Sequence, residues 1–391
     1  MGQQINLGFI NPNFSQKAMI YGLAKHLPKN KFRITLLQPS YNMLITGKSR
    51  IFEKNFNIIF FPSYSFPKID YTIPIFSEEL KLLIKLKYYD ILHVGDYFYP
   101  TCIPPLMSNR NGNASMILSV NALPGFNWRF GLKIVDITAK AYTYSIGKLI
   151  LNHYDKIIAI YNKLSEDLKR LGVPSHKISM IHNGVDCEKY KKVDQCQLIE
   201  LKKQLKIQDN EKVILFVGRL TKVKRVEYVI KLTKKLINDG HNIKTIIIGD
   251  GPYHKNYVEQ ANGYMNRIIF KRWISPTKLP LYYAIADVVV LTSISEGLPN
   301  VLLEAAAAGK PVVSTNVGGI SDIVIHNKTG FLVNPLDFDL FYKSANKLLT
   351  DSDLREEFSK NASIHVKMNF NWEIAVKKYE NLCNEVLKSK V

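Results

Sequence analysis

The sequence predicts an α/β protein built from two doubly wound domains, each with a parallel sheet between layers of helices. The chain has 391 residues, which is long for one hydrophobic core and suits two domains. Its hydrophobic content of 46% and charged content of 22% are typical of globular proteins. Short, almost wholly apolar runs alternate with amphipathic runs, a pattern that indicates strands buried on both faces.

This alternation occurs twice along the chain, with a charged break near residue 195. Predicted strands of the first half are 5–10, 32–38, 90–94, 116–120, 156–160 and 177–181. Predicted strands of the second half are 212–218, 244–251, 267–270, 286–293 and 310–315. We therefore predict a first domain at 1–193, a second domain at 194–370 and a C-terminal amphipathic helix within 371–391. The helix could pack on either domain, and one arrangement has it crossing back to the first.

Charge and cysteine content narrow the classes of partner. The net charge of +20 suits nucleic acid, an anionic membrane surface or phosphorylated substrates. The lysines are dispersed and do not form one basic face interleaved with aromatic residues, so we expect no nucleic-acid partner. The four cysteines lack CxxC spacing, which predicts neither a zinc site nor a disulfide framework. With no signal peptide and no run of about 18 apolar residues, the chain is expected to be cytoplasmic.

A basic segment follows the first predicted strand of the second domain. In "FVGRLTKVKR", Gly218 permits a sharp turn, and Arg219 and Lys224 lie near the start of a helix. Cations beside the backbone N–H groups of a helix start suit a diphosphate. The alternative is a solvated basic helix start. A "GDG" turn at 249–251 adds only weak support, because turns use glycine anyway.

Two carboxylates flank another predicted helix start in "SEGLPNVLLEAAAAGKPVVST", residues 295–315. Pro299 is predicted in the first turn, and the N–H groups near Asn300 and Val301 can face an anion. Glu296 precedes the helix, and Glu304 lies about two turns further on. A buried carboxylate needs a partner, which ribose or sugar hydroxyls would supply and a nearby cation would supply equally well.

These segments, together with "HNGVD" at 182–186, "IIIGDGP", "ADVVVLTSISEGLPNVLLEAAAAGKPVVSTNVGGISDIV" and "TGFLVNP", resemble the nucleotide-sugar half of retaining glycosyltransferases of family 4. The resemblance covers residues 180–391 strongly and 1–180 in outline. It implies the GT-B fold, in which two Rossmann-like domains face a central cleft. It also implies a retaining, metal-independent hexosyltransferase that uses a nucleoside diphosphate sugar as donor substrate and needs no cofactor.

The resemblance assigns roles to particular residues. Arg219 and Lys224, after Gly218, match the pair that binds the donor diphosphate. Glu296 matches the glutamate that contacts the donor sugar, and Glu304 matches the one that binds the ribose. The backbone amides of Gly297, Leu298, Asn300 and Val301 would hold sugar and phosphate. The side chain of Ile274 would pack on the base.

The first domain departs from the family pattern at two places. The family has a Gly-Gly loop after its first strand, whereas this chain has Asn13–Lys17, in which Lys17 could contact phosphate. The family often has a histidine where this chain has Asn121, a catalytic-site position whose amide cannot act as a base near pH 7. His93 and Asp96 are the nearby candidates, and a core role for His93 is an equal alternative.

The acceptor is predicted to be a glycan or glycolipid, because many members of the family act on lipid-linked acceptors. Two basic, apolar segments, 78–89 and 124–133, could lie on an anionic membrane surface. The second contains Phe126, Trp128 and Phe130. Both segments could instead pack on the core. These features favour a peripheral enzyme on the cytosolic face of a membrane.

Two rival functions remain open. A sugar-nucleotide epimerase or a phosphorylase could share this architecture, and an epimerase would need no acceptor. A nucleic-acid-binding protein would explain the net charge but would require a concentrated basic face.

Overall fold

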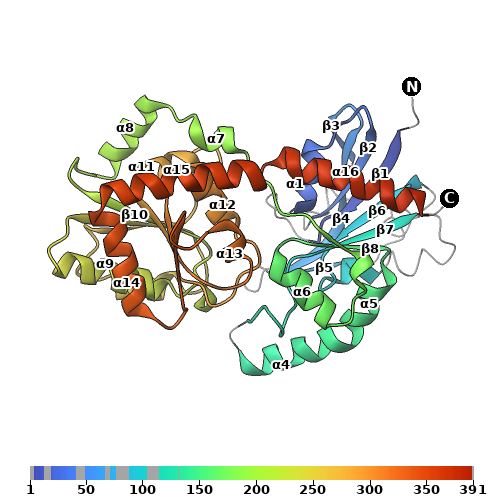
Figure 1. Cartoon of the computed structure of the whole chain (residues 1–391), viewed down its shortest axis with the longest axis horizontal. Helices are drawn as coiled ribbons and strands as arrows, with labels where there is room; N and C mark the ends of the chain where they lie inside the picture. The colour runs from blue at the N-terminus through green and yellow to red at the C-terminus, as the bar shows by residue number, and fades with distance from the viewer. Residues whose placement is uncertain are drawn as a thin grey trace. The chain divides into compact units, whose positions relative to one another are not determined.

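The computed structural model describes residues 4–12, 19–40, 49–66, 71–75, 88–103, 114–130 and 132–389. The chain divides into two compact units (Figure 1). The first unit comprises 1–128, 132–184 and 372–391, and the second comprises 129–131 and 185–371. The chain thus passes into the second unit after Gly184, earlier than the predicted boundary at 193/194, and returns after Asn371.

The first unit is built on a mainly parallel sheet. Its described strands run in the order β3 (Ser49–Glu53), β4 (Phe56–Phe66), β2 (Phe32–Ser40), β1 (Ile5–Ile10), β6 (Ile91–Gly95), β7 (Ser115–Val120), β8 (Lys156–Ala159) and β9 (Ile178–Met180). At one edge, β3 and β5 (Tyr71–Pro74) each pair antiparallel with β4. This antiparallel edge was not predicted from the sequence.

Helices of the first unit include one long segment interrupted by a π turn. The described helices are α1 (Met19–His26), η3 (Pro100–Cys102), α4 (Lys133–Tyr142), the π turn η5 (Thr143–Gly147), α5 (Lys148–His153), α6 (Asn162–Arg170), η6 (Ser175–Lys177) and α16 (Trp372–Lys388). The sequence pattern had not singled out the α4–η5–α5 segment.

Helix α16 belongs to the core of the first unit, although it comes from the other end of the chain (Figure 1). Its buried residues lie three or four apart, which places them on one face of the helix: Ala375, Tyr379, Leu382, Cys383 and Val386. The Trp372 ring packs so closely on Gly22 and Gly184 that a β-carbon at either glycine would lie within 2.4 Å of it. The helix therefore needs glycine at both contacts.

The second unit has a fully parallel sheet. Its strands run in the order β12 (Ile268–Lys271), β11 (Ile243–Ile248), β10 (Lys212–Val217), β13 (Val288–Leu291), β14 (Val312–Thr315) and β15 (Gly330–Val333). Its helices are α7 (Cys187–Lys191), α8 (Gln195–Gln204), η7 (Lys222–Lys224), α9 (Val226–Asn238), α10 (His254–Gln260), α11 (Leu279–Ile285), α12 (Asn300–Ala307), α13 (Ile320–Ile323), α14 (Phe338–Thr350) and α15 (Ser352–Asn369).

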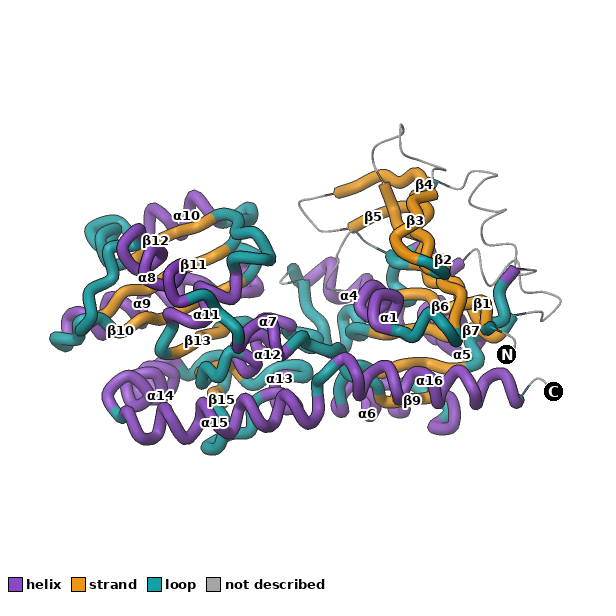
Figure 2. The backbone as a smooth tube through the Cα atoms, turned by 90° about the horizontal axis from the view of Figure 1, so that it is seen from above, coloured by secondary structure: helices purple, strands orange, loops and turns teal. Residues whose placement is uncertain are grey.

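Helices cover both faces of this second sheet. Figure 1 shows α9 and α14 on one side of β10 and α11 on the other, and Figure 2 shows the strands of this sheet following one another from β12 to β15. The doubly wound fold class predicted from the sequence is therefore confirmed, and helix α8 begins at the charged break that was noted near residue 195.

The order of the second sheet also locates a ligand site. The chain starts at β10, moves outward to β12 and then returns to β13 on the other side of β10. In open parallel sheets, ligands bind beside the carboxyl ends of the strands at such a reversal. The loops after β10 and β13 are therefore where a ligand is expected.

Candidate active site

The loop after β10 is held by close backbone contacts. The Gly218 N–H donates to the Ile248 carbonyl at 2.9 Å. A β-carbon on Gly249 would lie 1.8 Å from the Gly218 carbonyl oxygen, and one on Gly251 would lie 2.5 Å from the Leu220 oxygen. Both glycines have positive φ, 149° and 158°. The GDG turn is thus required for packing the basic loop.

Lys224 lies at the end of η7 and points to the loop after β13. Its Nζ lies 2.5 Å from Oε1 of Glu296, and the two side chains are 19% and 6% exposed. The Thr292 hydroxyl donates to the carbonyl of Lys224 at 2.7 Å and to that of Arg225 at 3.0 Å. The structure therefore brings together a cation and a carboxylate that stand far apart in the sequence.

Arg225, which follows Lys224, has a left-handed backbone with φ 49°. Its guanidinium carbon lies 3.7 Å from the centre of the Tyr228 ring, and its Nη1 donates to the Pro335 carbonyl at 3.0 Å. These contacts, together with the Glu227 carboxylate 3.3 Å from its Nε, hold the Arg225 side chain and stabilise the end of the basic loop.

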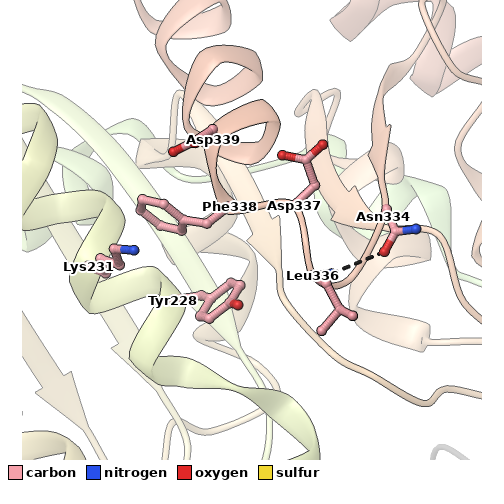
Figure 3. Close-up of a pocket in the computed structure, with 7 residues that line it drawn as sticks. All are labelled: Tyr228, Lys231, Asn334, Leu336, Asp337, Phe338 and Asp339. Carbon is pink, nitrogen blue, oxygen red and sulfur yellow. Dashed lines mark hydrogen bonds between the residues drawn. The ribbon is translucent and has the colours of Figure 1, made fainter.

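A pocket of about 630 Å³ lies beside Tyr228, the residue on which Arg225 stacks (Figure 3). It is lined by Tyr228, Lys231, Asn334, Leu336, Asp337, Phe338 and Asp339. Lys231 Nζ lies 4.0 Å from the Phe338 ring centre, and Asn334 Oδ1 accepts from the Leu336 N–H at 3.1 Å. Lys231 and Asn334 thus contact neighbouring residues of the pocket wall.

Glu296 is 4% exposed and held by two donors. Besides Lys224, the Ser293 hydroxyl donates to the same carboxylate oxygen at 2.6 Å. The backbone around Glu296 is fixed by the loop at 317–319, because a β-carbon on Gly318 would lie 2.0 Å from the Glu296 carbonyl oxygen. The Gly319 N–H donates to the Gly297 carbonyl at 2.7 Å. The carboxylate is therefore rigidly placed before a helix start.

Helix α12 begins at Asn300, and Pro299 is its N-cap. Pro299 was predicted inside the first turn, but it lies at the N-cap, just before that turn. Its carbonyl accepts the Leu302 N–H at 3.0 Å. Asn300 and Val301 occupy the first turn, where N–H groups point along the axis toward the Glu296 loop, and Leu298 is buried beside them.

Glu304 lies on the buried face of α12 and is 5% exposed. The Tyr283 hydroxyl on α11 donates to its Oε2 at 2.9 Å and also approaches the Val301 carbonyl at 3.1 Å. The Tyr190 hydroxyl on α7 is a second hydrogen-bond partner of Glu304. Burial, reinforced by the carboxylate, raises the pKa of both tyrosines, so both hydroxyls stay protonated near neutral pH.

Sequence reasoning missed these two tyrosines. Tyr190 lies among charged residues in the short helix α7, and Tyr283 lies among apolar residues in the short helix α11. Their rings pack edge to face with centres 5.6 Å apart. Nothing in their spacing distinguishes a carboxylate ligand from a core aromatic residue. The one signal available in the sequence was Glu304, because a buried carboxylate needs hydrogen-bond partners.

Two further predicted residues lie at the same edge of the sheet. Arg219 follows Gly218 directly and is half-buried. Ile274 follows β12 and is half-buried, beside Trp273, which is 74% exposed. Because all strands of the second sheet run parallel, the residues that follow β10 and β12 lie at the same carboxyl edge as Glu296, which follows β13.

In the first unit, Asn121 contacts an unusual aspartate. Asp96, which follows β6, is 7% exposed and has φ 57°, a left-handed backbone that outside glycine is found mainly at asparagine, aspartate and histidine. Asn121 Nδ2 donates to Asp96 Oδ2 at 3.1 Å, and the Phe98 N–H donates to Oδ1 at 3.3 Å. Burial raises the pKa of Asp96 to about 6, against the effect of these hydrogen bonds.

Of the two interpretations of His93, the structure supports a structural role in the core. It is fully buried, its Nδ1 lies 3.0 Å from the Tyr379 hydroxyl, and its Nε2 lies 2.7 Å from the Ser119 hydroxyl. Burial lowers the pKa of His93 to about 3, so it is neutral at physiological pH. It connects α16 to the sheet.

Some predicted features lie outside the described residues. These are the Asn13–Lys17 loop with Lys17, and all but the end of the 78–89 segment. Within the described ranges, no helix has the length and apolar character needed to span a membrane. The same residues hold no cluster of three or more histidine, cysteine, aspartate or glutamate side chains suited to a metal ion.

Comparison with known families matches both halves of the chain. The family described as "Glycosyltransferase Family 4" matches residues 16–189, and the family described as "Glycosyl transferases group 1" matches residues 199–365. Each match falls almost wholly in the residues before or after the charged break predicted near 195. Both halves of the chain therefore match glycosyltransferase families.

Individual proteins agree. The uncharacterized glycosyltransferase MJ1607 of Methanocaldococcus jannaschii is 32% identical over 58% of this chain and 59% of its own length. The capsular polysaccharide biosynthesis glycosyltransferase CapM of Staphylococcus aureus is 30% identical over 66% of this chain and 69% of its own. The chain thus spans about three fifths of the length of the first of these relatives.

A solved structure shares the fold. Anabaena Alr3699/HepE, determined in complex with UDP-glucose, superimposes with a TM-score of 0.76 at 17% identity, covering 99% of this chain and 100% of that one. With two doubly wound units and the carboxylate-flanked helix start in place, these matches show that the chain belongs to the group 1 glycosyltransferases of family 4 type.

Proposed function

We propose that this chain transfers a hexose from a nucleoside diphosphate sugar to an acceptor with retention of the anomeric configuration. The observation that carries the proposal is the Lys224–Glu296 contact at the sheet reversal, directly before the start of α12. A cation, a buried carboxylate and a helix start at one point can bind a phosphate and a sugar hydroxyl together.

The donor diphosphate is assigned to Arg219, Lys224 and the first N–H groups of α12. Negative charge develops on the diphosphate as the sugar departs, and preorganised cations and amides stabilise that charge. Lys224 would turn from Glu296 to phosphate, and Glu296 would accept hydroxyls of the sugar. Because two cations carry this role, the proposal requires neither a metal ion nor a cofactor.

The remaining contacts with the donor sugar nucleotide are assigned to residues at the same carboxyl edge of the second sheet. Glu304, oriented by Tyr190 and Tyr283, is assigned to the ribose hydroxyls, and Ile274 to the base. Backbone amides of Gly297, Leu298, Asn300 and Val301 are assigned to sugar and phosphate. The HepE complex with UDP-glucose supports a nucleotide-sugar donor for a chain of this fold.

For the first unit, we assign the acceptor hydroxyl to the Asp96–Asn121 pair. Asn121 can donate and accept hydrogen bonds but cannot take a proton near pH 7. Asp96 is the titratable member, and its raised pKa suits a group that exchanges a proton near neutral pH. This assignment leaves His93 out of the chemistry.

The acceptor is proposed to be a lipid-linked glycan or a glycolipid, handled by a peripheral enzyme on the cytosolic face of a membrane. The relative named for capsular polysaccharide biosynthesis supports a glycan product. The excess of positive charge supports an anionic surface.

A donor panel tests the proposal. The purified chain is incubated with UDP-, GDP- and ADP-sugars, with and without glycolipid acceptors, and products are identified by NMR. We expect one donor to be consumed and an axial or equatorial linkage that matches the donor configuration. Inversion would exclude the retaining mechanism. An altered sugar nucleotide formed without acceptor would indicate an epimerase.

A further inference from the structure

The helical segment of residues 132–149 comprises the residue before α4, all of α4 and η5, and the start of α5 (Figure 1). It exposes large apolar side chains. Ile134 is 78% exposed, Ile137 68% and Leu149 67%. Leu132, Val135, Tyr144 and Ile146 are also exposed. Single exposed apolar residues are ordinary, but a contiguous group in one segment marks an interaction site.

These side chains are not the packing face of the segment. Its packing face is formed by Ala139, Thr143, Gly147 and Ile150, spaced three or four residues apart and buried. The Thr143 hydroxyl donates to the Pro124 carbonyl at 2.8 Å and lies 3.0 Å from the Tyr97 hydroxyl. The segment is therefore already anchored to the first unit, and its apolar outer face needs a different partner.

The outer face has helical periodicity of its own. Ile134, Ile137, Ala141 and Tyr144 are exposed and follow one another at intervals of three and four, which puts them on one stripe. The Tyr144 ring lies 5.9 Å from Phe126 in the preceding turn. We call the exposed residues Leu132, Ile134, Ile137, Tyr144 and Leu149 the outer apolar face.

Cations flank this face. Lys133, Lys140 and Lys148 are all exposed, at intervals of seven and eight residues. Asp136, which is half-buried, is the sole acidic residue in the sequence 132–149. An apolar stripe bordered by lysines is complementary to a bilayer with anionic headgroups, in which the apolar side chains enter the acyl boundary.

We propose that residues 132–149 dock the first unit onto an anionic lipid bilayer. The inference rests on the proposed function, because docking would bring the enzyme to a lipid-linked acceptor. The charge of the segment favours a bilayer over a second copy of this chain, which would bring like charges together.

Vesicle binding tests the inference. The whole chain is sedimented with phosphatidylcholine vesicles, with and without phosphatidylglycerol, at low and high salt. We expect binding to the anionic vesicles that salt weakens. Ile134→Ser/Ile137→Ser should lower the partition coefficient at least tenfold. The matched control is Ile364→Ser/Met368→Ser, which removes two exposed apolar residues from α15 and should change nothing.

A charge pair separates the headgroup contribution. Lys133→Gln/Lys140→Gln should reduce anionic binding several-fold, whereas Lys163→Gln/Lys169→Gln, which neutralises two exposed lysines of α6, should reduce it much less. Equal losses in test and control variants, equal binding to neutral vesicles, or self-association abolished by the isoleucine variant would overturn the inference.

Nucleoside diphosphate binding is measured on the same variants. If vesicles are not bound but the nucleotide still is, the docking inference fails and the proposed function stands. If the parent chain binds no nucleoside diphosphate, the proposed function fails whatever the vesicles show.

Discussion

The buried carboxylates of the two units have different hydrogen-bond partners, one of them charged and the others neutral. In the second unit, Glu296 has a lysine ammonium 2.5 Å away and a serine hydroxyl on the same oxygen. In the first unit, Asp96 has an amide and a backbone N–H, both neutral, and its pKa rises to about 6. Glu296 is therefore paired with a charged partner, whereas burial among neutral donors raises the pKa of Asp96.

This difference separates a binding role from a proton-exchange role. A carboxylate held in place by a lysine and a serine is suited to accept hydrogen bonds from sugar hydroxyls. A carboxyl with a pKa near 6 changes state within the physiological pH range. Substitutions at these carboxylates and their partners test the contrast, and the largest expected effect comes first.

Lys224→Ala should produce the largest effect, because it leaves Glu296 buried without its cation. Removing one partner of a buried ion pair costs about 3–5 kcal/mol of folding stability. Turnover should fall at least about 100-fold through lost stabilisation of the diphosphate. Chemical denaturation and a donor-turnover assay measure the two effects.

Lys222→Ala is the matched control, since Lys222 lies in the same turn but is exposed. It should be nearly silent in both assays. Similar losses in the two variants would mean that Lys224 has no special role in the site.

Asp96→Asn should stabilise the fold at pH 7. Because burial raises the pKa of Asp96 from its ordinary value of 3.8 to about 6, the folded state binds the proton more tightly than the unfolded chain does. The free energy of unfolding therefore falls as pH rises through this window. Removing the ionisation should add roughly 2–3 kcal/mol at pH 7.5 and little at pH 4.

Denaturation curves at the two pH values measure this difference. Asparagine also tolerates a left-handed backbone, so the variant keeps the local geometry. Glu356→Gln, on the exposed side of α15, is the control and should show no such pH dependence. A variant less stable than the parent at pH 7.5 would contradict the buried-acid argument.

The two glutamates of the second unit should separate by ligand. Glu296→Gln should reduce turnover of the sugar donor while leaving affinity for the free nucleoside diphosphate nearly intact. Glu304→Gln should weaken both, by about 1.5–3 kcal/mol, because the ribose is common to both ligands. Calorimetric titration with the free nucleotide decides, and equal losses would refute the division of roles.

Tyr283→Phe should produce the smallest effect. It removes a hydroxyl that orients Glu304 and should weaken nucleotide binding by about 1 kcal/mol, roughly five-fold. Tyr282→Phe changes the adjacent tyrosine of α11 and serves as the control. If the two variants bind the nucleotide equally well, Glu304 does not depend on its tyrosine.

The second unit was more predictable from the sequence than the first. Strand ends near Gly218 and Glu296 were readable because parallel strands are long apolar runs that end in polar residues. The strands β3, β4, β5 and β15 were all missed. For β3 and β5 the reason is that antiparallel edges mix polar and apolar residues. The role of Asp96 depended on burial, which local sequence does not encode.

The 132–149 segment shows a further limit. Residues 134, 137 and 141 form an apolar stripe, and residues 139, 143, 147 and 150 form a second stripe of small and apolar side chains. Periodicity reveals a face but not which of two faces the fold will cover. Only the contacts of Thr143 with Tyr97 and Pro124 settle that question.

Helix α16 has a consequence for how this protein is made. Residues 372–388 supply Tyr379 to His93 and the Val386 carbonyl to Ser115, yet they follow the whole second unit along the chain. A ribosome adds roughly 5–20 residues per second, so the strands β6 and β7 wait on the order of ten seconds or more for their cover. The nascent first unit would be a substrate for chaperones until translation has passed residue 388.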